Sequence, residues 1–419
     1  MKNKSIDPVQ ISTIAKNMIF PSSMTTSIES ISEQGKIDYS LYPYRMQSDL
    51  YSGGSAPDQL LDFIKLSLQS HSDKKVLLLL SDGKDSMALA LGLSRLGIKA
   101  TTLTFLRSDD HELRKYVEEV SLGLGHDPYF ITSEQISAAL DLSYFIQSCK
   151  EMPGLVMDQG FIYFLFGMKS FFDINSYNPN DYRVLDGLGN DETFGYLPSK
   201  NQLMSFKLSK FNLWKIRPKS INFLKWYVRS PSESHGDLSA LASFFPFSEA
   251  LDLNQYFSKI EVSNSDEGYI DFRAFSRGSF HDHQCMMGKT ITACAQLGAD
   301  LEFPWLHPEL ASYVFNLPQE HKYKFDSIEN KIALRKLLIK EVGWSQSKRG
   351  VDLYFDLDYE RFLTDFASSI IPEKVSSIII NNKFLSSNVK KRASLELLNL
   401  YGYCVANGLS DDEISKILE

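Results

Sequence analysis

The chain has 419 residues, 43% of them hydrophobic, which is enough for a substantial core in one large domain or two. Its 44 basic and 52 acidic residues leave a net charge of −8, which counts against nucleic acid as the main partner. Four scattered cysteines form no readable zinc site or disulfide framework, and no apolar stretch has the length of a signal peptide or membrane span, so we expect a cytoplasmic protein.

The first motif along the chain is a polar turn between an apolar strand and a helix. Residues 1–57 form a Ser-rich lead segment with little periodicity, which we expect to precede the folded core. Residues 76–80 are a continuous apolar run, typical of a strand buried on both faces. Residues 87–93 continue as a helix that ends near Gly97. The turn Ser-Asp-Gly-Lys-Asp-Ser at 81–86 joins the two.

This turn has the composition of a phosphate site. Backbone N–H groups at a helix start face an anion, and small polar residues let phosphate oxygens approach the backbone closely. Asp85 is then placed to hold Mg²⁺ against those phosphates. The spacing is neither that of a Walker loop nor the Gly-x-Gly-x-x-Gly of dinucleotide folds. The alternative is an ordinary strand, turn and helix with common turn residues.

A second glycine turn follows farther along the chain. Between the two turns the sequence predicts a strand and a helix, at 98–105 and 113–125. Another apolar strand then ends in Gly-Leu-Gly-Asn-Asp-Glu at 187–192. Ligands of an open α/β sheet lie beyond the carboxyl ends of parallel strands, so both turns can face one pocket in which Asp85 and Asp191 share one Mg²⁺. The alternation over 58–200 predicts a parallel sheet with helices on both faces.

Helix patterns dominate from residue 201 onward, so 201–419 is expected to be a mainly helical part. Lys331 and Arg335 lie four positions apart in it, and Lys348 lies in a cationic turn; a solvated helix face and an ordinary surface turn are the alternatives. Residues 207–229 interleave cationic and aromatic side chains in a pattern that also suits polyanion binding, although such a pattern is more often the surface and core of an ordinary helical insert.

These motifs together resemble the synthetase domain of the asparagine synthetase family over roughly residues 59–355. Residues 81–86 are similar to the Ser-Gly-Gly-x-Asp-Ser signature of PP-loop ATP pyrophosphatases, with Asp82 at the second position. Residues 187–196 are similar to the family's Gly-Glu-Gly-Ser-Asp-Glu-x-Phe-Gly-Gly-Tyr. Three later segments are similar to its Leu-Glu-x-Arg-x-Pro-Phe-Leu-Asp, its Lys-x-x-Leu-Arg and its Arg-x-Lys-x-Gly/Phe, at 299–308, 331–335 and 347–351. The resemblance implies a PP-loop nucleotide-binding fold.

The resemblance also implies an AMP- and pyrophosphate-forming amide ligase that uses ATP and Mg²⁺. A carboxylate of the substrate attacks the α-phosphate of ATP, and a nitrogen nucleophile captures the acyl adenylate. Asp85 and Asp191 would hold Mg²⁺, and Lys348 would stabilise the negative charge that develops on oxygen. The residues implied to contact ATP or pyrophosphate are Ser81, Asp82, Gly83, Lys84, Asp85, Ser86, Phe105, Gly187, Gly189, Lys331 and Arg335.

The chain departs from the family pattern mainly in the half of the site that accepts the nitrogen. Leu188 stands where the family has a glutamate that handles the second substrate, which counts against asparagine as the product. Phe303 stands at the family arginine and His307 at the aspartate of the same segment. Glu192 is expected to orient the second turn. The activating half of the site therefore resembles the family more closely than the accepting half.

The nitrogen source is expected to lie outside this chain or on the substrate. Glutaminase domains of the family carry a nucleophilic cysteine after Met1, whereas residue 2 here is Lys2, and about 57 residues are too few for such a domain. The acceptor is then free ammonia, an amine from another protein, or an amine on the substrate, as in β-lactam synthetases and lasso-peptide cyclases. The expected carboxylate belongs to a small molecule or a peptide.

Two alternatives to a ligase stay open. A member without turnover would bind ATP as a sensor or assembly subunit, which Leu188 and Phe303 favour. A PP-loop enzyme that modifies a nucleic-acid base would bind RNA in a salt-sensitive manner, which the acidic balance makes weak.

Overall fold

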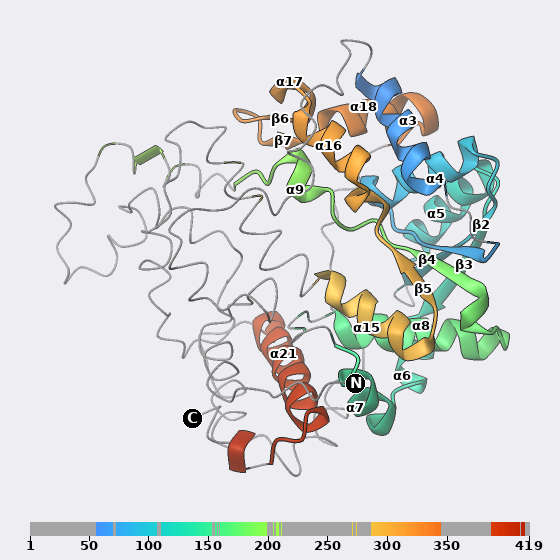
Figure 1. Cartoon of the computed structure of the whole chain (residues 1–419), viewed down its shortest axis with the longest axis vertical. Helices are drawn as coiled ribbons and strands as arrows, with labels where there is room; N and C mark the ends of the chain where they lie inside the picture. Colours follow the sequence, from blue (N-terminus) through green and yellow to red (C-terminus); the bar gives the residue numbers. More distant parts are fainter. Residues whose placement is uncertain are drawn as a thin grey trace.

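A computed structural model of the chain is shown in Figure 1. The residues that the structure describes are 56–69, 73–106, 110–152, 160–198, 286–344 and 387–410, together with 412–414 and isolated positions between these ranges. Residues 1–55 of the lead segment and the segment 347–351 with Lys348 lie outside the described residues, and so does nearly all of 207–229.

Five parallel strands form the central sheet in the order β3-β2-β1-β4-β5. Their bounds are β1 Lys75–Leu79, β2 Ala100–Leu106, β3 Asp127–Thr132, β4 Tyr182–Leu185 and β5 Asp300–Glu302. β1 lies in the middle, where Val76 pairs with Ala100 on one side and Arg183 on the other. The predicted parallel sheet is confirmed. Because successive strands leave β1 in opposite directions, the sheet has a switch point between β1 and β4, where ligands bind in such folds.

Helices cover both faces of the sheet, as predicted (Figure 1). On one face lie α3 (Ala56–Leu68), α4 (Lys84–Arg95), α5 (His111–Gly123), α16 (Pro308–Asn316) and α18 (Ile332–Val342). On the other lie α6 (Ser133–Ala138), α7 (Leu142–Cys149), α8 (Phe161–Asn175) and α15 (Met287–Leu297), and α21 (Ser387–Ala406) packs against α7 and extends the same core away from the sheet. Leu77 and Leu79 of β1 enter the second core while Val76 and Leu78 enter the first. Successive strand side chains alternate between faces, which is why the run at 76–80 is apolar throughout.

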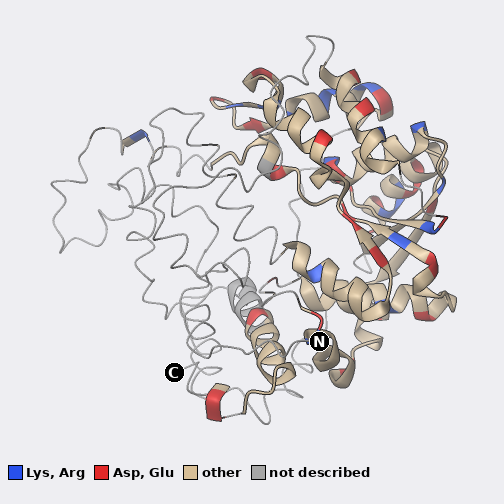
Figure 2. Ribbon diagram, in the orientation of Figure 1, with Lys and Arg blue, Asp and Glu red and all other residues tan. Residues whose placement is uncertain are grey.

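The edge strand β5 comes from the later half of the chain. It pairs with β4 so that Leu185 lies opposite Glu302. Its acidic side chains meet basic partners: Asp300 pairs with Lys74 at 2.8 Å and Glu302 with Arg183 at 3.3 Å. In Figure 2 this strand is largely red, whereas basic and acidic residues are interspersed over the elements around it. The sheet thus draws on both predicted parts, and the limits 58–200 and 201–419 stay a prediction.

Helix α8 shows how burial dictates composition. It is apolar nearly all round, and it packs against α15, which lies over the same face of the sheet. Phe161, Leu165, Phe166 and Phe171 in it are fully buried. A helix that is hydrophobic on every side belongs in an interior. Neither α8 nor any other described helix combines the length and apolar character that a membrane crossing requires.

Short elements connect the sheet to the later helices. They are η3 Pro179–Asp181, α9 Asp191–Phe194, η6 Pro304–Leu306, α17 Gln319–Lys322, β6 Tyr323–Lys324 and β7 Glu329–Asn330. β6 and β7 pair as a small antiparallel hairpin directly before α18. α9 and η6 lie at the carboxyl ends of β4 and β5, and the hairpin ends next to α9 in Figure 1. These connections bring distant parts of the sequence to one edge of the sheet.

Candidate active site

The first turn, residues 81–86, is held by its two serines as it runs from β1 into α4. The Ser81 N–H donates to Ser86 Oγ at 3.1 Å, and the two hydroxyls lie 3.2 Å apart. The Gly83 N–H donates to Ser81 Oγ at 3.1 Å. No side chain caps the start of α4, where N–H groups and the helix dipole favour an anion. The turn therefore joins a strand to a helix as predicted, and its binding of phosphate stays a prediction.

Two tryptophans from the later half of the chain hold the backbone of this turn. Trp305, which is fully buried, donates its Nε1–H to the Asp85 carbonyl at 3.2 Å. Trp344, just beyond the end of α18, donates its Nε1–H to the Asp82 carbonyl, also at 3.2 Å. A buried indole N–H requires an acceptor. Here both acceptors belong to the first turn, so residues more than 200 positions away fix its shape.

The second turn, residues 186–190, lies directly against the first. A Cβ on Gly187 would lie 3.0 Å from the Ser86 backbone nitrogen, so a residue with a side chain would push the two backbones apart. Gly189 has a φ of 105°, and a Cβ there would lie 2.9 Å from the Leu306 side chain. Both predicted glycines thus lie where a side chain would be strained, Gly187 by close packing and Gly189 also by its backbone angle. Asn190 follows as the N-cap of α9, and Asp191 begins that helix.

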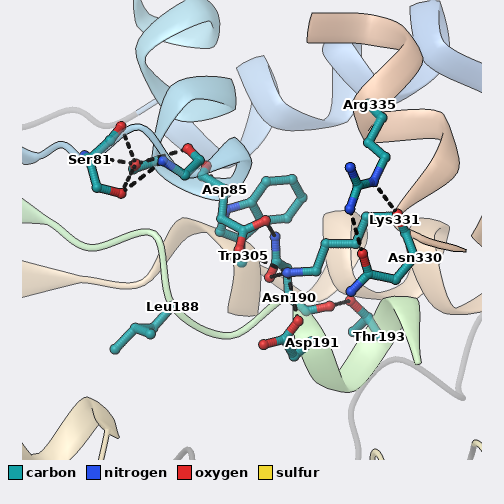
Figure 3. A network of polar contacts seen from close by, with 12 residues as sticks. Ser81, Asp85, Leu188, Asn190, Asp191, Thr193, Trp305, Asn330, Lys331 and Arg335 are labelled. Carbon is teal, nitrogen blue, oxygen red and sulfur yellow. Dashed lines mark hydrogen bonds and ion pairs between the residues drawn. The ribbon is translucent and has the colours of Figure 1, made fainter. Parts of the chain in front are cut away.

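One ammonium group joins the two turns (Figure 3). Lys331 Nζ lies 2.8 Å from Asp85 Oδ2 and 2.7 Å from Asp191 Oδ1. It also donates to Asn190 Oδ1 at 2.5 Å, while Asn190 Nδ2 donates to Asp85 Oδ1 at 2.7 Å. The Lys331 side chain is 1% exposed, whereas those of Asp85 and Asp191 are 29% and 38% exposed. The two predicted carboxylates therefore do converge, and they converge on a cation.

The β6–β7 hairpin presents Lys331 to this position. Lys331 is the N-cap of α18 and has left-handed backbone angles, φ 54° and ψ 46°, which are uncommon for a residue with a side chain. Arg335 secures this turn by donating to the Asn330 carbonyl at 2.7 Å and to Asn330 Oδ1 at 3.0 Å. Its guanidinium lies over the Trp344 ring, 5.7 Å from the ring centroid. Arg335 thus braces Lys331, and its predicted contact with nucleotide stays a prediction.

The charges of the site shift the pKa values of its lysines in opposite directions. Burial alone lowers the pKa of Lys331, but Asp191 and Asp85 outweigh it, so its pKa lies above the ordinary value and the group is an ammonium. Burial and the nearby Lys331 lower the pKa of Lys84. Lys84 and Lys331 therefore lie within range of each other's charge, and the carboxylates of Asp85 and Asp191 offset part of it.

An Mg²⁺ site at Asp85 and Asp191 fits this donor set. The three atoms that surround the Lys331 ammonium are all oxygens, which Mg²⁺ prefers, and the ammonium shows that a cation is favoured there. Among the described residues, no group of three or more His, Cys, Asp or Glu is placed to hold a metal ion. Mg²⁺ typically takes one or two protein carboxylates and completes its shell with phosphates and water.

A second polar cluster supports the other side of the second turn. Asp186, at the end of β4, accepts from the Leu188 N–H at 3.1 Å and from the Thr290 hydroxyl at 2.7 Å. Burial raises the pKa of Asp186. Nearby, the buried Lys289 pairs with the buried Asp158 at 3.4 Å. Each of these groups has a partner, so the cluster fixes how the second turn sits on α15.

The remaining predicted residues lie around this centre or outside the described part. Lys348 and the side chain of Glu192 lie outside it. Phe105, at the end of β2, packs edge-on against Tyr163 and Phe164, with ring centroids 5.5 Å and 5.2 Å away. Its contact with adenine stays a prediction. Leu188 lies apart from the Lys331 ammonium, as Figure 3 shows, and its side chain carries no carboxylate.

Sequence reasoning missed Asn190, Trp305 and Trp344. Asn190 stands between Gly189 and Asp191, at a position where the family motif has serine. Its position inside the motif was the one feature of the sequence that could have marked it as a site residue. Trp305 lies within the matched segment at 299–308, whereas nothing in the sequence around Trp344 connects it with the first turn. Both indole contacts depend on tertiary folding.

Comparison with known proteins agrees with this geometry. No curated protein matches the chain at a significant level. The sequence model of the family described as asparagine synthase matches residues 60–399 of the 419, which include both turns, Trp305 and Lys331. The chain therefore belongs to the asparagine synthase family of ATP-dependent ligases that form amide bonds.

Proposed function

We propose that the protein activates a substrate carboxylate with ATP and transfers the acyl group to a nitrogen nucleophile, forming AMP, pyrophosphate and an amide. The observation that carries this proposal is the convergence of Asp85 and Asp191 on one cation position beside the uncapped start of α4. The two turns follow neighbouring strands at the switch point of the sheet. This arrangement suits a metal-bound triphosphate better than a turn of structural use alone.

The reaction has two steps. A carboxylate oxygen attacks the α-phosphorus of ATP, and the bond from that phosphorus to the bridging oxygen breaks, so pyrophosphate leaves. The nitrogen then attacks the acyl carbon, the bond to the AMP oxygen breaks, and the nitrogen loses a proton. Residues 81–86 and the start of α4 would hold the departing pyrophosphate, with Lys84 adding positive charge. Bound Mg²⁺ would supply charge neutralisation on the phosphates.

Lys348 is proposed to stabilise the developing negative charge. It follows Trp344 by four residues, so the chain between them spans at most about 14 Å. Trp344 itself donates to the Asp82 carbonyl of the first turn. Four residues of chain from the anchored indole are long enough for Lys348 to reach phosphates at the first turn, which supports its assignment.

The nitrogen nucleophile is proposed to be an amine carried by the substrate or brought by another protein, with free ammonia as the third source. Leu188 offers no group that accepts a proton from the nucleophile. An amine on the same molecule needs no separate binding site, because intramolecular attack gains a high effective concentration. This favours ring closure on a small molecule or a peptide with a free carboxylate.

The test is to identify the nucleotide product. The protein is incubated with Mg²⁺, ATP, ammonium and a small-molecule extract of its source cells, and the nucleotides are separated by chromatography. Asp85→Ala is the inactive variant, and Asp62→Ala, which breaks an exposed pair with Lys65, is the matched control. AMP and pyrophosphate that require extract and disappear only in Asp85→Ala support the ligase. ADP, or ATP binding without turnover, would move the sensor or assembly role to first place.

A further inference from the structure

The Lys331 ammonium occupies the position between the two carboxylates that are proposed to bind Mg²⁺. Asp85 uses both carboxylate oxygens, one for Lys331 Nζ and the other for Asn190 Nδ2. Asp191 Oδ1 and Asn190 Oδ1 also contact Lys331 Nζ, at 2.7 Å and 2.5 Å. The three contacts of Lys331 Nζ thus surround the end of a side chain that is almost completely buried. The protein has thus already provided a cation for these oxygens.

A metal ion and this ammonium cannot share the position. Mg²⁺ requires its oxygen ligands at about 2.0–2.1 Å, and the same oxygens now contact an ammonium at hydrogen-bond distance. A dication inserted between them would lie beside a positive charge in a poorly solvated site, where repulsion between cations is strong. A metal ion that takes this position therefore has to break at least one Lys331 contact. A displaced ammonium needs another anion, because its position offers little access to water.

We propose that Lys331 is a resident cation that holds the two turns together in the empty enzyme and yields its place when the metal arrives together with nucleotide. The phosphates of ATP, bound at the adjacent first turn, provide the new anion for the ammonium. Metal binding without nucleotide is consequently weak. This inference rests on the proposed function only in taking Asp85 and Asp191 as the metal ligands.

The left-handed backbone at Lys331 and the Arg335 brace fit this role. Together they fix the start of the side chain, so the exchange requires movement of the side chain alone. A residue held in a rare backbone conformation marks a position where placement matters more than local stability. Replacement of lysine by methionine keeps an unbranched side chain at this position, so the backbone cost is unchanged.

The experiment measures Mn²⁺ binding to nucleotide-free protein by electron paramagnetic resonance of the free ion. Mn²⁺ substitutes for Mg²⁺ at oxygen sites. Lys331→Met is expected to bind one Mn²⁺ at least about tenfold more tightly than wild type, equivalent to about 1.4 kcal/mol. The gain should vanish in Lys331→Met/Asp191→Asn. Lys340→Met is the control, since Lys340 is exposed on the same helix and pairs with Asp58.

Two results would overturn the proposal. One is an unchanged Mn²⁺ affinity in folded Lys331→Met. The other is tight, Asp191-dependent binding of Mn²⁺ to nucleotide-free wild type, which needs no variant of Lys331 at all. If circular dichroism shows that Lys331→Met does not fold, Lys331→Gln replaces it in the same comparison. The Mn²⁺ experiment measures no turnover, so its result decides only whether metal displaces the Lys331 ammonium. Absence of AMP formation in the nucleotide experiment would refute the proposed ligase activity and leave the displacement of Lys331 untouched.

Discussion

Replacing Asn190 by alanine tests how the two turns are joined. The change removes two hydrogen bonds to charged groups, to Asp85 at 2.7 Å and from Lys331 at 2.5 Å. Asp85 is 29% exposed and recovers water, whereas Lys331 is 1% exposed and keeps only its two carboxylates. We expect the free energy of unfolding to fall by about 2–3 kcal/mol, with about 0.5–1 from the Asp85 bond and about 1.5–2 from the Lys331 bond.

ATP affinity should fall with it, by about tenfold or about 1.4 kcal/mol, because Asp85 loses its direct hydrogen bond to the second turn. Unfolding is followed in urea, and ATP binding by calorimetry. Asn175→Ala in α8 is the matched control: it loses one bond to the Phe171 carbonyl at 2.7 Å and should cost no more than about 1 kcal/mol. Asn190→Ser should behave like alanine, because a hydroxyl is too short to bridge both groups. A loss in Asn190→Ala no larger than in Asn175→Ala, with unchanged ATP affinity, refutes the reasoning.

Three further changes test other parts of the site. Gly187→Ala forces a methyl against the backbone of the first turn and should cost about 1–3 kcal/mol in urea unfolding, whereas Gly123→Ala meets open space and should not. Trp344→Phe removes the donor to the Asp82 carbonyl and should weaken ATP binding by roughly threefold to tenfold in calorimetry, about 0.5–1.5 kcal/mol. Burial raises the pKa of Asp186, so the carboxyl group binds its proton more tightly in the native state than in the unfolded chain. The free energy of unfolding of wild type, relative to that of Asp186→Asn, should therefore increase as the pH falls toward about 4 and decrease near neutral pH. Equal differences at both pH values in urea unfolding would contradict that assignment of burial.

Much of the fold follows from local pattern. The continuous apolar run at 76–80 predicts a strand buried on both faces, and β1 is such a strand at the centre of the sheet. The predicted strand at 98–105 and helix at 113–125 correspond to β2 and α5, each displaced by about two residues, as is usual where helix and strand ends are decided by hydrogen bonds. β5 was beyond such reasoning, because three residues carry too little periodicity to reveal a strand.

The site was predictable in its anchors and not in its connections. Glycine turns after two strands indicated where Asp85 and Asp191 would meet, because the carboxyl ends of parallel strands share one edge. Their meeting at Lys331 was not indicated, since a lysine before a helix is equally typical of a solvated surface. The indole contacts from Trp305 and Trp344 to carbonyl groups involve no side-chain pattern in the first turn at all.

The position of β5 has a consequence for how the chain is made. β4 ends at Leu185, and β5, which pairs with it, begins only at Asp300. During synthesis the backbone N–H and C=O groups along that edge of β4 therefore stay unpaired until β5 has been made. An unpaired strand edge is a template for association with other chains, and contacts between distant segments form slowly. A chain that stops before β5 is therefore expected to aggregate rather than to yield a nucleotide-binding fragment. The yield of native protein would then depend on chaperones that shield this edge until synthesis passes Glu302.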